Sequence, residues 1–161
     1  MKGSDREEVT VKYASATLGR ALVVRLEDGD VVHESIEAAV RAEGISRAAV
    51  LLLGGADDGS RVVVGPEESR AARMVPMERV LHGAHEVAGV GTIFPDESGQ
   101  PVLHLHAAFG RDDQVVAGCI RKGVLTWVVG EAVVIELLGS AAARRLDPAT
   151  GFELLDPGES R

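Results

Sequence analysis

Short runs of β-branched and aliphatic residues, separated by turn-forming residues, constrain the fold of this chain more than any other feature. Each run predicts a strand, and the runs are residues 9–11, 20–26, 48–53, 61–64, 86–94, 102–109, 114–120 and 128–138. The segments between them are rich in Asp, Gly and Pro, which favour turns. Because several of these connections are short enough to be hairpin loops, we expect a mostly antiparallel sheet.

One segment has helical rather than strand periodicity. Its apolar residues recur at helical spacing between Asp30, a suitable N-cap, and Gly44, a suitable stop. A second, short helix is expected at residues 140–146, where Ser140 can cap the first turn and Arg144 suits the negative end of the helix dipole. The expected class is α+β, with one main flanking helix, a short C-terminal helix and a mostly antiparallel sheet.

The length of 161 residues fits a single domain. We place an N-terminal extension with a first strand at residues 1–17, the folded domain at 18–138, and the C-terminal helix with an acidic tail at 139–161. Hydrophobic residues make up 45% of the chain and aromatic residues only 3%, so the core must be aliphatic.

The charge and the cysteine content exclude several classes of function. The formal net charge is −8, which opposes the phosphate backbone, so we expect no direct nucleic-acid partner. The single cysteine, Cys119, excludes an intramolecular disulfide, and the start of the chain shows no apolar stretch typical of a signal peptide. The longest apolar run, at 48–53, is far shorter than the roughly 20 residues of a membrane helix. These features predict a cytoplasmic protein without a membrane span.

Two histidines alternate with leucines in the run at 102–109. His104 and His106 should therefore lie on one face of a strand, with Leu103 and Leu105 on the other. Alternate residues of a strand are ~6.6–7 Å apart at Cα, so both imidazoles can reach one cation. The pair fits a metal site about as well as it fits two half-exposed polar residues, so the motif alone has low specificity.

The hairpin that follows adds two candidate residues. A two-residue loop at 112–113 would pair His106 with Cys119. The thiol could be a further metal ligand, a thiolate held by a cation, or a small half-buried strand residue, which is the interpretation we favour here. The same count places His104 opposite Arg121, a cation that could mark the site of a substrate anion.

His82 and His85 precede the strand expected at 86–94, and they are natural candidates for a third ligand. A regular antiparallel register would pair Val90 with His106 and leave His85 several residues too far along. The two glycines of that strand could permit a bulge that shortens the distance. The pattern therefore leaves the third ligand open.

Several motifs occur in a recognisable order along the chain. They are RALVVRLEDGD at 20–30, AVLLLGGA at 49–56, HEV at 85–87, GTIFP at 91–95, HLHAAFGR at 104–111 and GCI at 118–120. Together they resemble the plants-and-prokaryotes-conserved (PPC) domain family over about residues 18–138. The resemblance implies an antiparallel sheet with flanking helices and a homotrimer. In a prokaryotic subset it also implies a metal held by a histidine ahead of the hairpin and by the His-x-His pair, here His85, His104 and His106.

Three nitrogen donors without clustered carboxylates suit Zn²⁺ or a similar divalent transition metal better than Mg²⁺ or Ca²⁺. Two functions are compatible with such a site. One is a metal-binding module, which we favour because no second base accompanies the histidines at evident spacing. The other is a metal-dependent enzyme that holds a small anionic substrate with Arg111 or Arg121. A DNA-associated regulator is less favoured, because the chain lacks the Arg-Gly-Arg hook of the plant relatives.

Overall fold

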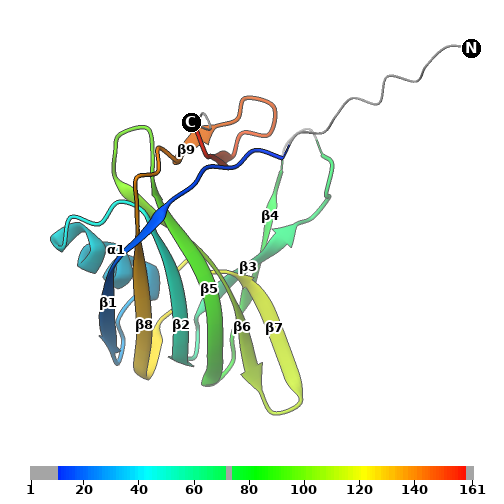
Figure 1. Ribbon diagram of the computed structural model, residues 1–161. Helices are drawn as coiled ribbons and strands as arrows, with labels where there is room; N and C mark the ends of the chain where they lie inside the picture. Colours follow the sequence, from blue (N-terminus) through cyan, green and yellow to red (C-terminus); the bar gives the residue numbers. More distant parts are fainter. Residues whose placement is uncertain (1–10, 72–73, 159–161) are drawn as a thin grey trace, which may run out of the picture.

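The computed structural model describes residues 11–71 and 74–158. Within them the chain forms one helix and ten strands (Figure 1). The elements are β1 (Thr17–Glu27), α1 (Val32–Ala42), β2 (Ala48–Ala56), β3 (Arg61–Pro66), β4 (Pro76–Val80), β5 (His85–Pro95), β6 (Pro101–Arg111), β7 (Gln114–Cys119), β8 (Thr126–Leu138), β9 (Ala143–Leu146) and β10 (Glu153–Asp156). Of the expected first strand, Val9 and Thr10 lie outside the described residues, and Val11 is not in a strand.

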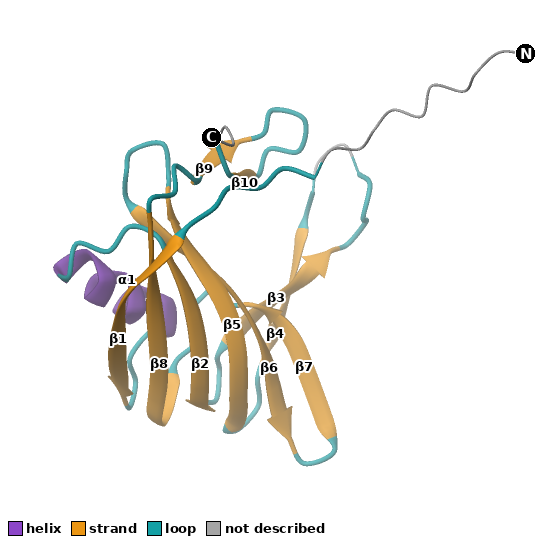
Figure 2. Ribbon diagram, in the orientation of Figure 1, coloured by secondary structure: helices purple, strands orange, loops and turns teal. Residues whose placement is uncertain are grey.

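Eight strands form one antiparallel sheet in the order β1-β8-β2-β5-β6-β7-β3-β4, and β9 pairs with β10 in a separate small sheet (Figure 2). The predicted α+β class, with a mostly antiparallel sheet and one main helix, is confirmed. Seven predicted strand runs correspond to β1, β2, β3, β5, β6, β7 and β8. In the described residues no helix is long and apolar enough to cross a membrane.

Helix α1 covers one face of the sheet with the apolar side chains of Val32, Ile36 and Val40. Its C-terminus is closed by two hydrogen bonds, because the Ile45 N–H donates to the Val40 carbonyl at 2.8 Å and the Gly44 N–H donates to the Arg41 carbonyl at 3.1 Å. This is a Schellman motif, in which Gly44 takes a left-handed conformation with φ of 67°. The predicted stop at Gly44 is confirmed.

The predicted N-cap of α1 is wrong. Val31 occupies that position and makes no side-chain capping bond. The carboxylate of Asp30 instead accepts a hydrogen bond from the backbone N–H of Glu27 at 2.9 Å, which closes the turn before the helix. An aspartate side chain can accept a hydrogen bond in a turn or at the N-terminus of a helix, and the side chain of Asp30 accepts one in the turn.

The expected C-terminal helix is also wrong, because Ala143–Leu146 forms β9 and pairs with β10. Ser140 does accept a hydrogen bond, from the Ala142 N–H to its Oγ at 3.1 Å, but the chain then runs on as a strand. Ala142, Ala143 and Arg144 are buried, so tertiary packing and pairing with β10 outweigh the helix propensity of the alanines.

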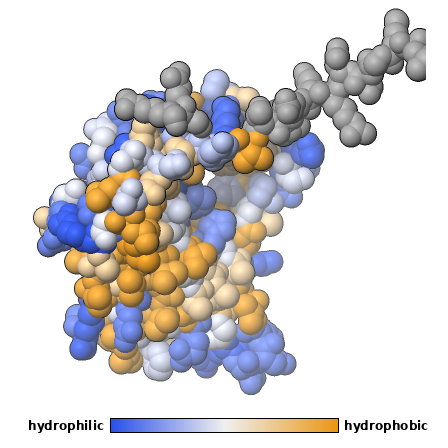
Figure 3. All heavy atoms as spheres, in the orientation of Figure 1, coloured by the Kyte–Doolittle hydropathy of each residue, from blue (hydrophilic) through white to orange (hydrophobic). Residues whose placement is uncertain are grey.

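The hydrophobic core lies between α1 and the sheet, and it includes Leu26, Val50, Ile93, Leu105 and Phe109. The opposite face of the sheet carries apolar side chains that this chain leaves open. Cross-strand pairing aligns Val23, Val133, Leu51 and Val90 in one row. In this row Val23 is 78% exposed, Leu51 49% and Val90 63%. Figure 3 shows hydrophobic side chains gathered over the strands of the sheet in the same view.

Candidate metal centre

The side chains of β6 point alternately into the core on one face of the sheet and toward the candidate site on the other face. Leu103, Leu105, Ala107 and Phe109 are buried in the core, while His104 is half-buried and His106 is exposed on the other face. The predicted register is confirmed, because His106 pairs with Val90 on β5 and with Cys119 on β7. The strand pairing therefore fixes the backbone positions of both histidines and of the cysteine.

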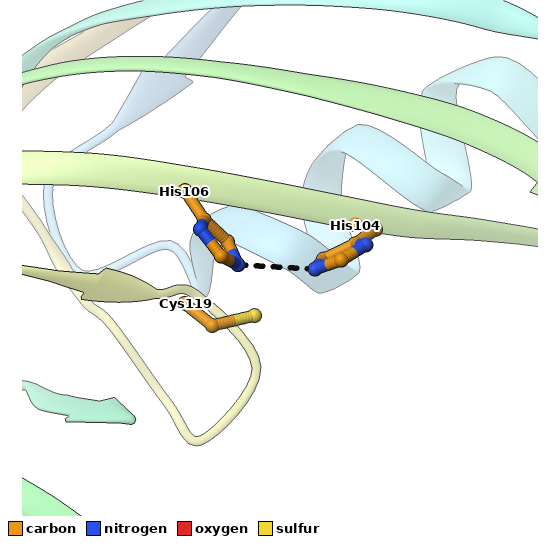
Figure 4. Close-up of side chains that lie close together, drawn as sticks. All are labelled: His104, His106 and Cys119. Carbon is orange, nitrogen blue, oxygen red and sulfur yellow. Dashed lines mark hydrogen bonds between the residues drawn. The ribbon is translucent and has the colours of Figure 1, made fainter. Parts of the chain in front are cut away.

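The side chains of His104, His106 and Cys119 converge. The two Nε2 atoms of the histidines are 3.0 Å apart, and the Sγ atom of Cys119 points toward the space beside them (Figure 4). One donor atom from each of the three residues lies within 4.8 Å of the others. The imidazole rings meet edge to face, with centroids 4.9 Å apart and an interplanar angle of 74°. Both rings thus direct their Nε2 atoms into one small volume.

This arrangement fits a tetrahedral metal ion. Zinc–nitrogen bonds of about 2.0–2.1 Å place two ligating nitrogens roughly 3.3 Å apart, close to the separation of the two Nε2 atoms. Two imidazoles and a thiolate are borderline to soft donors, which suit zinc and similar divalent ions and not magnesium or calcium. Three protein ligands leave one tetrahedral position for water or another ligand.

The electrostatic environment keeps one histidine in the protonation state that a metal requires. Burial, together with the charges of Arg144, Arg121 and His106, lowers the pKa of His104 to about 4. His104 is therefore a neutral imidazole at neutral pH, with a lone pair free to bind a cation. The Arg121 guanidinium donates a hydrogen bond from Nε to the Cys119 sulfur at 3.0 Å.

His85 and Arg111 lie together at a different place. His85 starts β5, and its Nδ1 donates to the Gly83 carbonyl at 2.9 Å, while Arg111 donates to the Ala84 carbonyl at 2.6 Å. Both line a cleft of about 350 Å³ that also includes His82. Because β5 residues next to His85 pair with the end of β6, the structure does not bring His85 into the cluster around His106.

Arg144 is the residue of this region that the sequence pattern missed. It was expected at the end of a helix, but it lies on β9 with only 5% of its surface exposed. Its Nη2 donates to the Thr92 hydroxyl at 3.1 Å, and Thr92 pairs with His104 in the sheet. No sequence spacing connects position 144 with position 104, because the packing of β9 beside β5 is a tertiary contact.

The family of the chain follows from its sequence profile. The profile of the Plants and Prokaryotes Conserved (PCC) domain, the family called PPC above, matches residues 13–138. The chain belongs to this family. Among curated proteins no match is found. The match spans β1 to β8, so the PPC domain contains the whole eight-stranded sheet and all three clustered donors.

Solved structures share this fold at low sequence identity. A PPC protein from Pyrococcus horikoshii is 22% identical with a TM-score of 0.77, and the match covers 92% of this chain and 99% of that one. A metal-containing protein from Archaeoglobus fulgidus is 22% identical with a TM-score of 0.77, covering 89% and 98%. A proposed DNA-binding protein from Bacteroides thetaiotaomicron is 19% identical with a TM-score of 0.71, covering 89% and 99%.

Proposed function

We propose that this PPC protein is a homotrimeric metal-binding module that holds one divalent transition-metal ion, Zn²⁺ or a similar ion, on His104, His106 and a third donor. The observation that carries the proposal is the 3.0 Å approach of the two Nε2 atoms with a thiol in the same cluster. The metal-containing relative from Archaeoglobus fulgidus supports it. The net charge of −8 argues against direct binding of duplex DNA.

The third donor distinguishes two forms of the proposal. The geometry within one chain favours Cys119, whose sulfur is part of the cluster. The family resemblance implies His85, which lines the separate cleft. A thiolate ligand needs a reduced cysteine, which a cytoplasmic location would supply, and we propose that compartment for the protein.

Metal analysis of purified variants tests the proposal. Wild-type protein, purified without a nickel column and equilibrated with Zn²⁺, should carry about one tightly bound ion per chain by plasma mass spectrometry. His104→Ala, His106→Ala and Cys119→Ala should each lose that ion, because each removes one of three donors. His33→Ala is the matched control, since His33 is a histidine on α1 outside the cluster, and it should retain the ion.

His85→Ala decides between the two donor sets. Full metal content in this variant, together with loss in Cys119→Ala, would establish Cys119 as the third ligand. The reverse result would establish His85. A wild-type protein that retains no ion after equilibration with Zn²⁺ would contradict the proposed function altogether.

A further inference from the structure

Within the described residues, a buried guanidinium lies beside the cluster without forming an ion pair. Arg144 is 95% buried, the complement of its 5% exposure, and its Nε has no hydrogen-bond partner among residues 11–71 and 74–158. Its one side-chain bond is to a neutral group, the Thr92 hydroxyl. Removing a cation from water costs several kcal/mol unless an anion or several acceptors compensate. In the part of the chain that the structure describes, the charge of Glu153 on β10 acts on Arg144 but forms no ion pair with it, so the compensation is incomplete.

A second guanidinium lies close to the first. Arg121 follows β7, and its Nε contacts the Cys119 sulfur at 3.0 Å. It is close enough to Arg144 for the two positive charges to repel each other. In residues 11–71 and 74–158, neither arginine takes part in an ion pair with a carboxylate. Two like charges held together in this way indicate that a shared anion belongs between or beside them.

The sheet brings these groups to one place from distant parts of the chain. Thr92 comes from β5, His104 from β6, Cys119 from β7 and Arg144 from β9. With Arg121, this arrangement holds two positive charges near His104 in a chain whose net charge is −8. A guanidinium presents a planar set of N–H donors that matches the oxygens of a carboxylate or a phosphate. The chemistry of the site therefore selects a small oxyanion.

We propose that Arg144 and Arg121 form a binding site for a small oxyanion, a carboxylate or phosphate group, next to the metal ligands His104, His106 and Cys119. This inference deepens the proposed metal-binding function and rests on it, because the same anion would also face the ligand position that three protein donors leave open. The unpartnered Nε of Arg144 then gains an acceptor, and the two guanidinium groups gain a common counter-charge.

Calorimetric titration with two probes, inorganic phosphate and succinate, tests the proposal on metal-free and Zn²⁺-loaded protein. At least one probe should bind the wild type, and Arg144→Gln and Arg121→Gln should each weaken that binding by about tenfold or more. Arg145→Gln is the matched control, because Arg145 is the next residue on β9 but is exposed. It removes the same charge and should leave the affinity unchanged.

Metal content, measured on the same samples, separates this proposal from the proposed function. Loss of anion binding at unchanged metal content supports the oxyanion site. Arginine-dependent binding by a wild-type protein that retains no ion after equilibration with Zn²⁺ supports the oxyanion site and contradicts the metal function. Absence of binding by both probes in both forms, or binding that neither arginine substitution weakens, overturns the proposal. Because Arg121 is exposed, Arg121→Gln remains a valid test if circular dichroism shows that Arg144→Gln does not fold.

Discussion

His104 resists protonation because it is half-buried and because Arg144, Arg121 and His106 are close to it. Its pKa in the folded protein is about 4, against 6.5 for an unperturbed histidine. The unfolded chain therefore binds a proton at this position in a pH range where the folded protein does not. By linkage, protonation in that range favours unfolding.

We predict that the free energy of unfolding of the metal-free protein decreases as the pH falls from about 6.5 to about 4, with His104 contributing part of the decrease. Above that range His104 is neutral in both states, so its contribution is constant. Urea unfolding of wild-type protein and His104→Gln at several pH values measures this effect. The variant should show a shallower decrease, and equal slopes in the two proteins would contradict the prediction.

Among the individual residues of the site, the sequence predicted those that strand pairing brings together. Counting along the hairpin was sufficient to place Cys119 opposite His106, because a two-residue loop fixes the register. The interpretation of Cys119 as a small strand residue could not be decided by counting, since a ligand and a space-filling residue occupy the same register position. Arg144 could not be found at all, because its place depends on how β9 packs beside β5.

Among the elements, β7 depends on a glycine for its contact with β3. A Cβ atom at Gly118 would lie 2.6 Å from Cγ1 of Val62 and closer still to the Val63 carbonyl oxygen. These distances are shorter than any normal carbon contact, and the nearer atom belongs to the backbone. The two strands can therefore approach closely only because position 118 has no side chain.

We predict that Gly118→Ala lowers the free energy of unfolding by about 1–3 kcal/mol, because the added methyl group must displace β3. Gly110→Ala is the matched control on the neighbouring strand β6, where a Cβ atom would meet nothing within 4 Å. Its stability should stay close to that of the wild type. Urea denaturation of the three proteins provides the comparison, and equal stability of the two variants would be evidence against a close strand contact at position 118.

The elements that the sequence did not predict share a physical reason. All residues of β4 and all of β10 are exposed, so neither strand shows the alternation that marks a half-buried strand. β9 begins within a run of alanines, whose intrinsic preference is helical. β4, β9 and β10 form because they pair with neighbouring strands, whereas the central strands can be recognised from their own hydrophobic pattern.

On the scale of the whole molecule, the sheet has one face covered by α1 and one face with an open apolar row. Val23, Val133, Leu51 and Val90 lie side by side across four strands, and the next position in that row is His106. Exposed apolar residues aligned in this way are typical of subunit interfaces. The row therefore supports the proposed homotrimer.

We predict that the wild type sediments as a trimer at micromolar concentration and that Leu51→Glu dissociates it. A carboxylate in the middle of the apolar row would have to be buried without a partner on association. Leu154→Glu, at an exposed leucine on β10 outside the row, is the control and should remain trimeric. A monomeric wild type in analytical ultracentrifugation would refute the prediction.

The alternation of β6 has an evolutionary consequence. The donor atoms of His104 and His106 lie on one face of the strand, and the side chains that hold the domain together lie on the other. Single substitutions can therefore exchange one donor for another, or abolish the site, while the buried side chains of the core stay unchanged. Lineages that share this fold can therefore diverge in what they bind. An insertion of one residue into β6 would move the donor residues and the core residues to the wrong faces of the strand, so selection should remove it.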